Sequence, residues 1–118
     1  MVWAKVASML MFLGVMLGAF GAHALRGKIT DYYLDVYKTA VLYHMIHALG
    51  LFVVAWASTI SKDNNVNLAG CFILAGILLF SGSLYALSVT SIKWLGAITP
   101  LGGVSFLIGW AILFTLKF

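Results

Sequence analysis

Four long apolar stretches dominate the chain, and they occupy residues 6–25, 39–60, 68–89 and 95–116. A helix needs roughly 20 mostly apolar residues to cross the hydrocarbon core of a bilayer, and backbone groups must be hydrogen-bonded there. The alternation of apolar and polar residues that is typical of a membrane barrel is absent from these stretches. The pattern therefore predicts an all-α membrane protein with four transmembrane helices.

The later connections, at residues 61–67 and 90–94, are short, which is typical of antiparallel neighbours. We therefore expect an antiparallel bundle that forms a single domain over residues 1–118, with both termini on one side of the membrane. The first stretch also resembles a secretory signal, because Lys5 precedes an apolar run that ends in small residues. This run exceeds the roughly 7–15 residues of such a signal, so we expect it to remain as a helix.

The connection at residues 26–38 is longer than the others and has an amphipathic pattern. Thr30 is a predicted N-cap, and Asp31 favours the positive end of a helix. Two helical faces differ in polarity, with Asp31, Asp35 and Lys38 on one and Leu34, Tyr37 and Val41 on another. We interpret the segment as an amphipathic extension of the second helix, or as a separate surface helix without a ligand.

Composition and charge exclude a water-soluble protein. The chain is 64% hydrophobic and only 8% charged, whereas soluble domains are about 25% charged. The net charge of +4 is spread over chain ends and short loops, which favours contact with anionic lipid and gives no support for a nucleic-acid partner. The single cysteine, Cys71, excludes an intramolecular disulfide, and its apolar surroundings predict a buried position.

Ionisable groups inside a membrane span are costly and are candidates for a functional site. His44 and His47 lie three residues apart on the second stretch, so they point to the same side of a helix. Connectivity places the end of the first and third stretches beside the start of the second and fourth. We therefore expect a polar layer at this level, formed by His23, Tyr43, His44, His47, Ser81, Tyr85 and Thr99. We predict that His23, His44, His47 and Tyr85 converge inside the bundle.

The chemistry of this layer has three interpretations. The histidines can hydrogen-bond neighbouring helices as packing groups, line a proton or solute pathway, or bind a metal ion or haem. The His-x-x-His pair supplies only two ligands, and neither a cysteine nor a buried carboxylate completes a usual zinc set. Catalytic motifs such as His-Glu-x-x-His and Gly-x-Ser-x-Gly are absent. We favour the packing interpretation and predict no catalytic residue, no metal and no cofactor.

Glycines form a second pattern on the first and fourth stretches. Small residues at one helical face allow two helix backbones to approach closely. We expect such close crossings, within or between subunits, at Gly14, Gly18, Gly21, Gly102 and Gly109.

Four blocks of sequence resemble the domain-of-unknown-function 423 membrane family, which includes bacterial inner-membrane proteins and the eukaryotic transmembrane protein 256. The blocks are GAFGAHAL (18–25), YHMIHALGL (43–51), LFSGSLYAL (79–87) and ITPLGGVSFLIGWA (98–111). The resemblance implies a small multi-pass protein of a bacterial-type inner (plasma) membrane and implies no activity. Its motifs fall on His23, His44, His47, Ser81, Tyr85, Thr99 and Pro100.

Three functions remain open at this point. The first is a non-enzymatic component, either a homo-oligomer or an accessory subunit of a larger membrane complex, whose partners are lipid, itself or other membrane subunits. The second is a small transporter or channel that uses the histidine-lined layer. The third is a haem- or metal-binding membrane protein.

Overall fold

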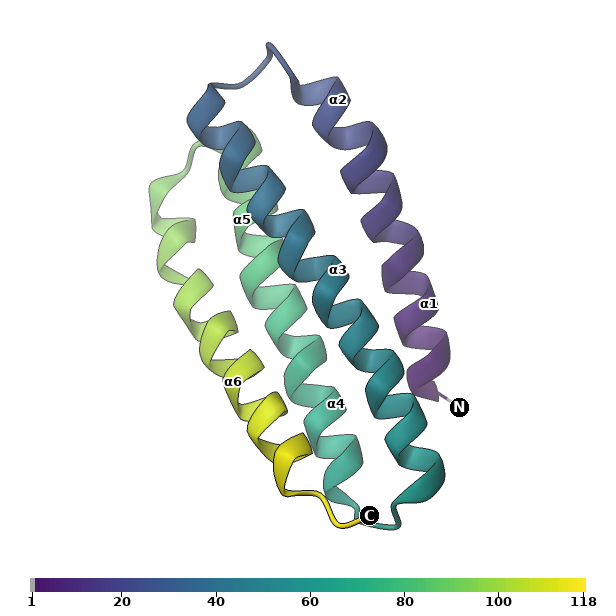
Figure 1. Cartoon of the computed structure of the whole chain (residues 1–118). Coiled ribbons are helices and arrows are strands. Elements are labelled where there is room, and N and C mark those ends of the chain that lie inside the picture. Colours follow the sequence, from purple (N-terminus) through teal and green to yellow (C-terminus); the bar gives the residue numbers. More distant parts are fainter. Residues whose placement is uncertain (1) are drawn as a thin grey trace.

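The computed structural model describes residues 2–118, which form four long helical units that run alternately up and down (Figure 1). The second unit is one uninterrupted helix, whereas π-helical turns interrupt the first and third, and a 3-10 turn precedes the fourth. In chain order the elements are α1 (Val2–Val15), η1 (Met16–Gly21), α2 (Ala22–Leu25), α3 (Asp31–Ile60), α4 (Asn65–Gly76), η2 (Ile77–Ser81), α5 (Gly82–Thr90), η3 (Lys93–Ala97) and α6 (Thr99–Thr115).

All four units are long and apolar enough to cross a membrane, which confirms the predicted spans. They comprise Val2–Leu25, Asp31–Ile60, Asn65–Thr90 and Lys93–Thr115. Each unit begins before the corresponding apolar stretch. The reason is that the helices continue through polar and aromatic residues, such as Trp3 and Lys93, which suit the membrane surface.

The amphipathic segment is continuous with α3. The hydroxyl of Thr30 accepts a hydrogen bond from the backbone N–H of Tyr33, 3.2 Å away, and so caps the helix before Asp31. In the turns that follow, Leu34 and Tyr37 are buried, while Asp31 and Asp35 are exposed. The first turns of α3 therefore present charge outward and apolar or aromatic groups to the other helices.

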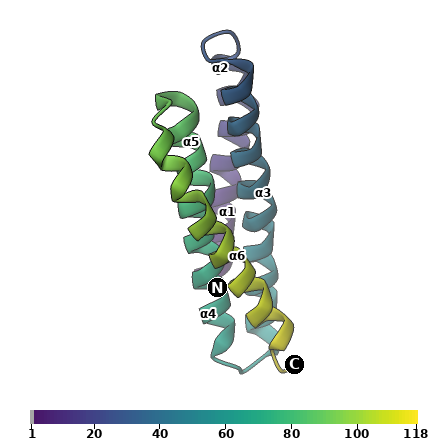
Figure 2. The same ribbon diagram turned by 90° about the vertical axis from the view of Figure 1, so that its left-hand side faces the viewer.

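The four units form an open row rather than a closed ring. The first unit packs mainly on α3, α3 also packs on the third unit, and α6 packs on α4 and η2 (Figures 1 and 2). The Cα atoms accordingly span 49 × 26 × 16 Å, so the cross-section perpendicular to the long axis is elongated rather than round. Half of the most apolar part of α3 is buried, against 11% for the first unit. The second unit is thus the centre of the molecule, and α1 lies at its edge.

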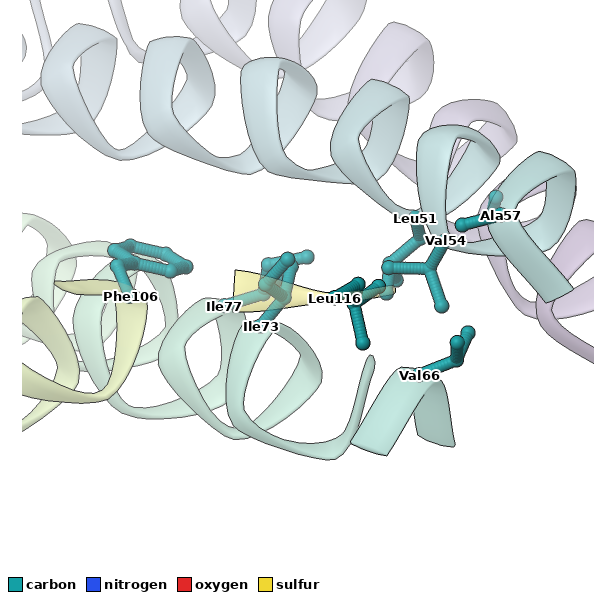
Figure 3. Packing of buried hydrophobic residues seen from close by; sticks show 9 residues of the cluster. Leu51, Val54, Ala57, Val66, Ile73, Ile77, Phe106 and Leu116 are labelled. Atoms are coloured by element: carbon teal, nitrogen blue, oxygen red, sulfur yellow. The ribbon is translucent and has the colours of Figure 1, made fainter. Parts of the chain in front are cut away.

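An apolar core fills the half of the row that contains the two termini. Leu51 and Val54 of α3 face Ile73 and Ile77 of the third unit, and Leu116 enters between them (Figure 3). The hydroxyl of Ser61 donates a 2.6 Å hydrogen bond to the carbonyl of Lys117, which ties the C-terminal segment to the end of α3. Lipid is as apolar as these side chains, so close packing holds this core together.

The prediction that Cys71 is buried was wrong, because its side chain is exposed on α4. Gly70 and Ile73 supply the buried face of this helix. Cys71 follows Gly70 by one residue, which is about 100° around the helix axis, and it therefore points outward.

Candidate functional site

One face of α3 carries the polar layer. Tyr37, Ala40, His44 and His47 are all buried there. Their spacing of three, four and three residues keeps the four side chains on one side of a helix with 3.6 residues per turn. Because α3 is the central helix of the row, this face meets the first unit, the third unit and α6.

His44 links three helical units through both ring nitrogens. Its Nε2 lies 2.7 Å from the carbonyl oxygen of Leu10 in α1, and its Nδ1 lies 2.8 Å from the hydroxyl of Tyr85 in α5. A carbonyl oxygen only accepts hydrogen bonds, so we assign the proton to Nε2. In the neutral imidazole the lone pair on Nδ1 then accepts from the Tyr85 hydroxyl, so both ring nitrogens are engaged.

His47 has the opposite arrangement of donor and acceptor. Its Nδ1 lies 2.8 Å from the backbone carbonyl of Tyr43, one turn earlier, and its Nε2 accepts a 3.0 Å hydrogen bond from the indole N–H of Trp110 in α6. The Trp110 indole can only donate, so Nε2 must be unprotonated and Nδ1 carries the proton. The imidazole also stacks on Phe106, with ring centroids 3.5 Å apart.

Hydroxyl groups complete the links between helices. Tyr37 donates a 2.6 Å hydrogen bond to the carbonyl of Leu17 in η1. Ser81, at the end of η2, donates a 2.8 Å hydrogen bond to the carbonyl of Ala40. These two bonds attach a π-helical turn on either side to the central helix.

The fourth unit is joined to the third in the same way. The hydroxyls of Ser83 and Thr99 lie 2.6 Å apart, and Ser105 donates a 2.6 Å hydrogen bond to the carbonyl of Phe72. Over residues 2–118, every buried side-chain nitrogen and oxygen atom has a hydrogen-bond partner. The layer is therefore a satisfied network, as polar groups at membrane depth require.

This geometry determines what the layer can do chemically. All four ring nitrogens of His44 and His47 are already used within the chain. A metal ion or haem iron would have to displace Leu10, Tyr85, Tyr43 or Trp110 from one of them. Residues 2–118 contain no group of three or more His, Cys, Asp or Glu side chains arranged to hold a metal ion.

The structure brings most of the predicted residues together, but it does not bring His23 to them. His44, His47, Ser81 and Tyr85 share the network described above. The side chain of His23 is exposed. Gly21 faces Tyr37 of α3, and His23 follows it by two residues, about 200° around the helix axis. The prediction that His23 converges with the other three is therefore corrected.

Tyr43 and Thr99 lie at the border of the layer. The Tyr43 side chain is 38% exposed and packs on Phe80, with ring centroids 4.5 Å apart. Its ring lies parallel to that of His47, and its backbone carbonyl is the hydrogen-bond partner of His47 Nδ1. Thr99 meets Ser83 at the start of α6. Tyr43 is near the histidines in sequence and Thr99 lies at a similar depth along the bundle, but neither side chain hydrogen-bonds to an imidazole.

Sequence reasoning missed four side chains of the network, Tyr37, Ser83, Ser105 and Trp110. Tyr37 was detectable, because it precedes His44 by seven residues and thus shares its helical face. Trp110 gave no such signal. Its contact with His47 depends on the register between α3 and α6, and its ring rests on Gly50 of α3.

The predicted glycines lie at helix contacts within one chain. A methyl group added to Gly14 or Gly18 would lie 3.0 Å from Met45 or Val41 of α3. Gly21 abuts the hydroxyl of Tyr37, Gly102 abuts the backbone of Phe80, and Gly109 abuts Ile73. The first-unit glycines thus contact α3, whereas those of α6 contact the third unit.

Comparison with known proteins assigns the chain to a family. The model of a family described as "Protein of unknown function (DUF423)" matches residues 17–103. The UPF0382 membrane protein YwdK of Bacillus subtilis (strain 168) is 65% identical over 99 residues, which are 83% of this chain and 80% of YwdK. The UPF0382 membrane protein SAB0533 of Staphylococcus aureus (strain bovine RF122 / ET3-1) is 54% identical over 101 residues, which are 86% of this chain and 82% of SAB0533. No solved structure matches the chain. The chain belongs to the DUF423 family of membrane proteins.

Proposed function

We propose that this chain is a non-enzymatic membrane component that assembles through the outer face of α1, as a homo-oligomer or as an accessory subunit of a larger complex. The observation that carries the proposal is a contrast between two parts of the molecule. The polar groups of the layer are satisfied within one chain, while the outer face of α1 has no neighbour in the row.

The outer face of α1 has a shape that suits a second helix. A shallow, open hollow over its first turns is lined by Ala4, Lys5, Ser8, Met9 and Phe12. Ala4 and Ser8 are small residues four apart, which is the spacing at which membrane helices approach closely. The larger side chains of Met9 and Phe12 border the hollow and would pack against the partner.

The apolar core argues against a transport pathway through a single chain. A pathway that starts at the histidines would have to continue through the half of the row that contains the termini. There Leu51, Val54 and Ile73 are fully buried against one another. A solute or proton would meet close-packed hydrocarbon at this level, without polar groups to replace its hydration.

Cross-linking in native membranes tests the proposal. The native cysteine is first removed by Cys71→Ser, and single cysteines are then introduced as Ser8→Cys or, as a control on the exposed face of α6, Leu107→Cys. We expect Ser8→Cys to form a covalent dimer or an adduct with another membrane protein, and Leu107→Cys to stay monomeric. A dimer indicates a homo-oligomer and an adduct an accessory subunit, whereas a monomer at position 8 overturns the proposal.

A bulky substitution provides the complementary test. Ser8→Trp would fill the hollow without touching the interior, because Ser8 is exposed and bonds only to the carbonyl of Ala4 in its own helix. We expect the complex to dissociate in mild detergent while the monomer stays folded. Leu107→Trp is the matched control and should leave the complex intact. Loss of assembly in both variants, or in neither, would contradict a specific role for α1.

A further inference from the structure

The end of the molecule opposite the termini has two adjoining hollows that the polar layer does not use. Both are lined by Tyr33, in the first turn of α3, and we call them the Tyr33 hollows. One, of about 450 Å³, lies between the connection before α3 and the end of α5. The other, of about 490 Å³, lies between α3 and η3. Both hollows are open to the surface, so a group bound there would remain partly exposed.

Each hollow contains one lysine from a different connection of the chain. Lys28 lines the first and Lys93 lines the second. The acidic residues nearby, Asp31 and Asp35, line neither hollow. Asp31 precedes Tyr33 by two residues and Asp35 follows it by two, so each lies about 160–200° from Tyr33 around the α3 axis. Lys28 and Lys93 are therefore the charged side chains that line the Tyr33 hollows.

Hydroxyl groups add hydrogen-bond donors to these cations. Thr30 and Ser91 line the first hollow, and Tyr32 lines the second. The Thr30 oxygen already accepts from the N–H of Tyr33, which leaves its O–H free to donate to a ligand. Ammonium groups together with hydroxyl donors are the chemistry that binds a phosphate group.

The position of the hollows in the fold indicates which phosphate they would meet. The first and third units end here, at Leu25 and Thr90, so these connections lie at one surface of the membrane. Leu87 and Val89, from the last turns of α5, form apolar parts of the two linings. A cationic, hydroxyl-lined rim above apolar side chains matches a phospholipid, whose headgroup is polar and whose chains extend toward the bilayer centre.

We propose that the Tyr33 hollows bind the phosphate-bearing headgroup of an anionic phospholipid, with Lys28 and Lys93 as the cationic groups. This site is distinct from the outer face of α1, and the failure of either proposal leaves the other standing. An anionic lipid is favoured over a zwitterionic one because it brings no ammonium group of its own to compete with the lysines.

Lipid retention measures this site directly. The full chain is reconstituted in nanodiscs of phosphatidylcholine mixed equally with phosphatidylglycerol, released in mild detergent, and examined by native mass spectrometry. We expect the wild type to retain phosphatidylglycerol selectively. At about a factor of five for each ammonium group that contacts the anionic headgroup, Lys28→Gln with Lys93→Gln should weaken retention about 25-fold. Equal retention of both lipids by the wild type would overturn the proposal.

Two further variants separate a site from general surface charge. Lys62→Gln with Lys117→Gln removes the same charge from exposed lysines at the other end of the molecule, and it should leave retention unchanged. Lys28→Arg with Lys93→Arg keeps both charges and should restore retention. An equal loss in the Lys62 and Lys117 variant, or no restoration by arginine, would contradict a cationic site at the Tyr33 hollows.

Inorganic phosphate distinguishes a lipid from a soluble anion. Thermal unfolding of the detergent-solubilised wild type is followed with phosphatidylglycerol or with inorganic phosphate alone. We expect phosphatidylglycerol to raise the unfolding temperature in a manner that depends on Lys28 and Lys93, and phosphate to have no such effect. The same lysine-dependent stabilisation by phosphate alone would overturn the lipid assignment in favour of a soluble phosphate ligand.

Discussion

At the scale of single residues, the two neighbouring imidazoles differ in which nitrogen carries the proton. His44 donates from Nε2 to the carbonyl of Leu10, whereas His47 donates from Nδ1 and accepts at Nε2 from Trp110. Each tautomer is determined by a partner that can act in only one way, a carbonyl for His44 and an indole N–H for His47. Histidine is thus used here as a rigid group with one donor and one acceptor at a fixed separation.

A double-mutant cycle measures the bond between His47 and Trp110. His47→Leu and Trp110→Phe each remove one partner and retain an apolar side chain at the contact. Hydrogen bonds between membrane helices average about 0.6 kcal/mol, so we expect a coupling of that size in the free energy of unfolding. Unfolding of reconstituted protein by added sodium dodecyl sulphate provides the measurement.

The control for this cycle pairs Trp110→Phe with Ser61→Ala, which removes the separate bond to Lys117. These two changes share no partner and should add to within about 0.3–0.5 kcal/mol. A coupling of zero between His47 and Trp110 would mean that their hydrogen bond does not contribute to stability in the membrane.

At the scale of elements, contacts between helices depend on glycines that are adjacent in sequence but differ in environment. Gly102 of α6 is buried against the backbone of Phe80 in η2, with no space for a Cβ atom. Gly103 is only half-buried, and a Cβ added there would lie 3.9 Å from the Phe80 ring. One of the two glycines therefore determines how closely α6 approaches η2, and the other does not.

The pair Gly102→Ala and Gly103→Ala tests this contact. A methyl group at position 102 must push the two helices apart, and overpacking of this kind costs about 1–3 kcal/mol. Gly103→Ala should cost little, because its added methyl group makes only an ordinary van der Waals contact. The free energies of unfolding of both variants are compared with that of the wild type. Equal effects of the two substitutions would show that the close approach to Phe80 does not limit packing.

The helical units themselves were predictable, but their neighbours were not. Bilayer thickness sets the length of an apolar run, so the four spans follow from counting residues. Which helices pack against one another depends on the shapes of their side chains. The apolar faces of the four helices are similar in composition, so the sequence does not show which faces meet. His23 illustrates the limit. Its depth along the bundle followed from connectivity, but the side of the helix on which its side chain lies followed only from the contact of Gly21 with Tyr37. Trp110 illustrates it again, because only the register of α6 against α3 brings it to His47.

At the scale of the whole molecule, both ends of the chain lie at the same end of the row (Figure 1). The apolar core occupies that half, the hydrogen-bonded layer follows, and the Tyr33 hollows lie at the opposite surface. The protein therefore differs along its length. The half that contains the termini holds the apolar core and isolated hydrogen bonds such as that of Ser61 to Lys117, whereas the linked hydrogen bonds of His44, Tyr85 and Ser81 lie toward the opposite surface.

Reporter fusions test this orientation of the chain. A reporter that is active on only one side of the membrane is fused to the N-terminus in one protein and to the C-terminus in another. Because the chain has four spans, we expect both fusions to report the same side. Insertion of the reporter at Asn64, between α3 and α4, should also report that side. Fusions at the two termini that report opposite sides would contradict an even number of spans.

The edge position of α1 has a consequence for how freely its sequence can vary. Both buried polar side chains that hold the first unit, Tyr37 and His44, belong to α3, and their acceptors are the backbone carbonyls of Leu17 and Leu10. A carbonyl has two lone pairs, so that of Leu17 also accepts the N–H of Ala22 within its own helix. Every residue type supplies a carbonyl, and therefore these two attachments place no demand on the side chains at positions 10 and 17. The demands on side chains of the first unit come instead from three other features: the glycines that permit its approach, Ala7, which is buried in the core, and Trp3, whose indole donates a hydrogen bond to Asn67 of α4.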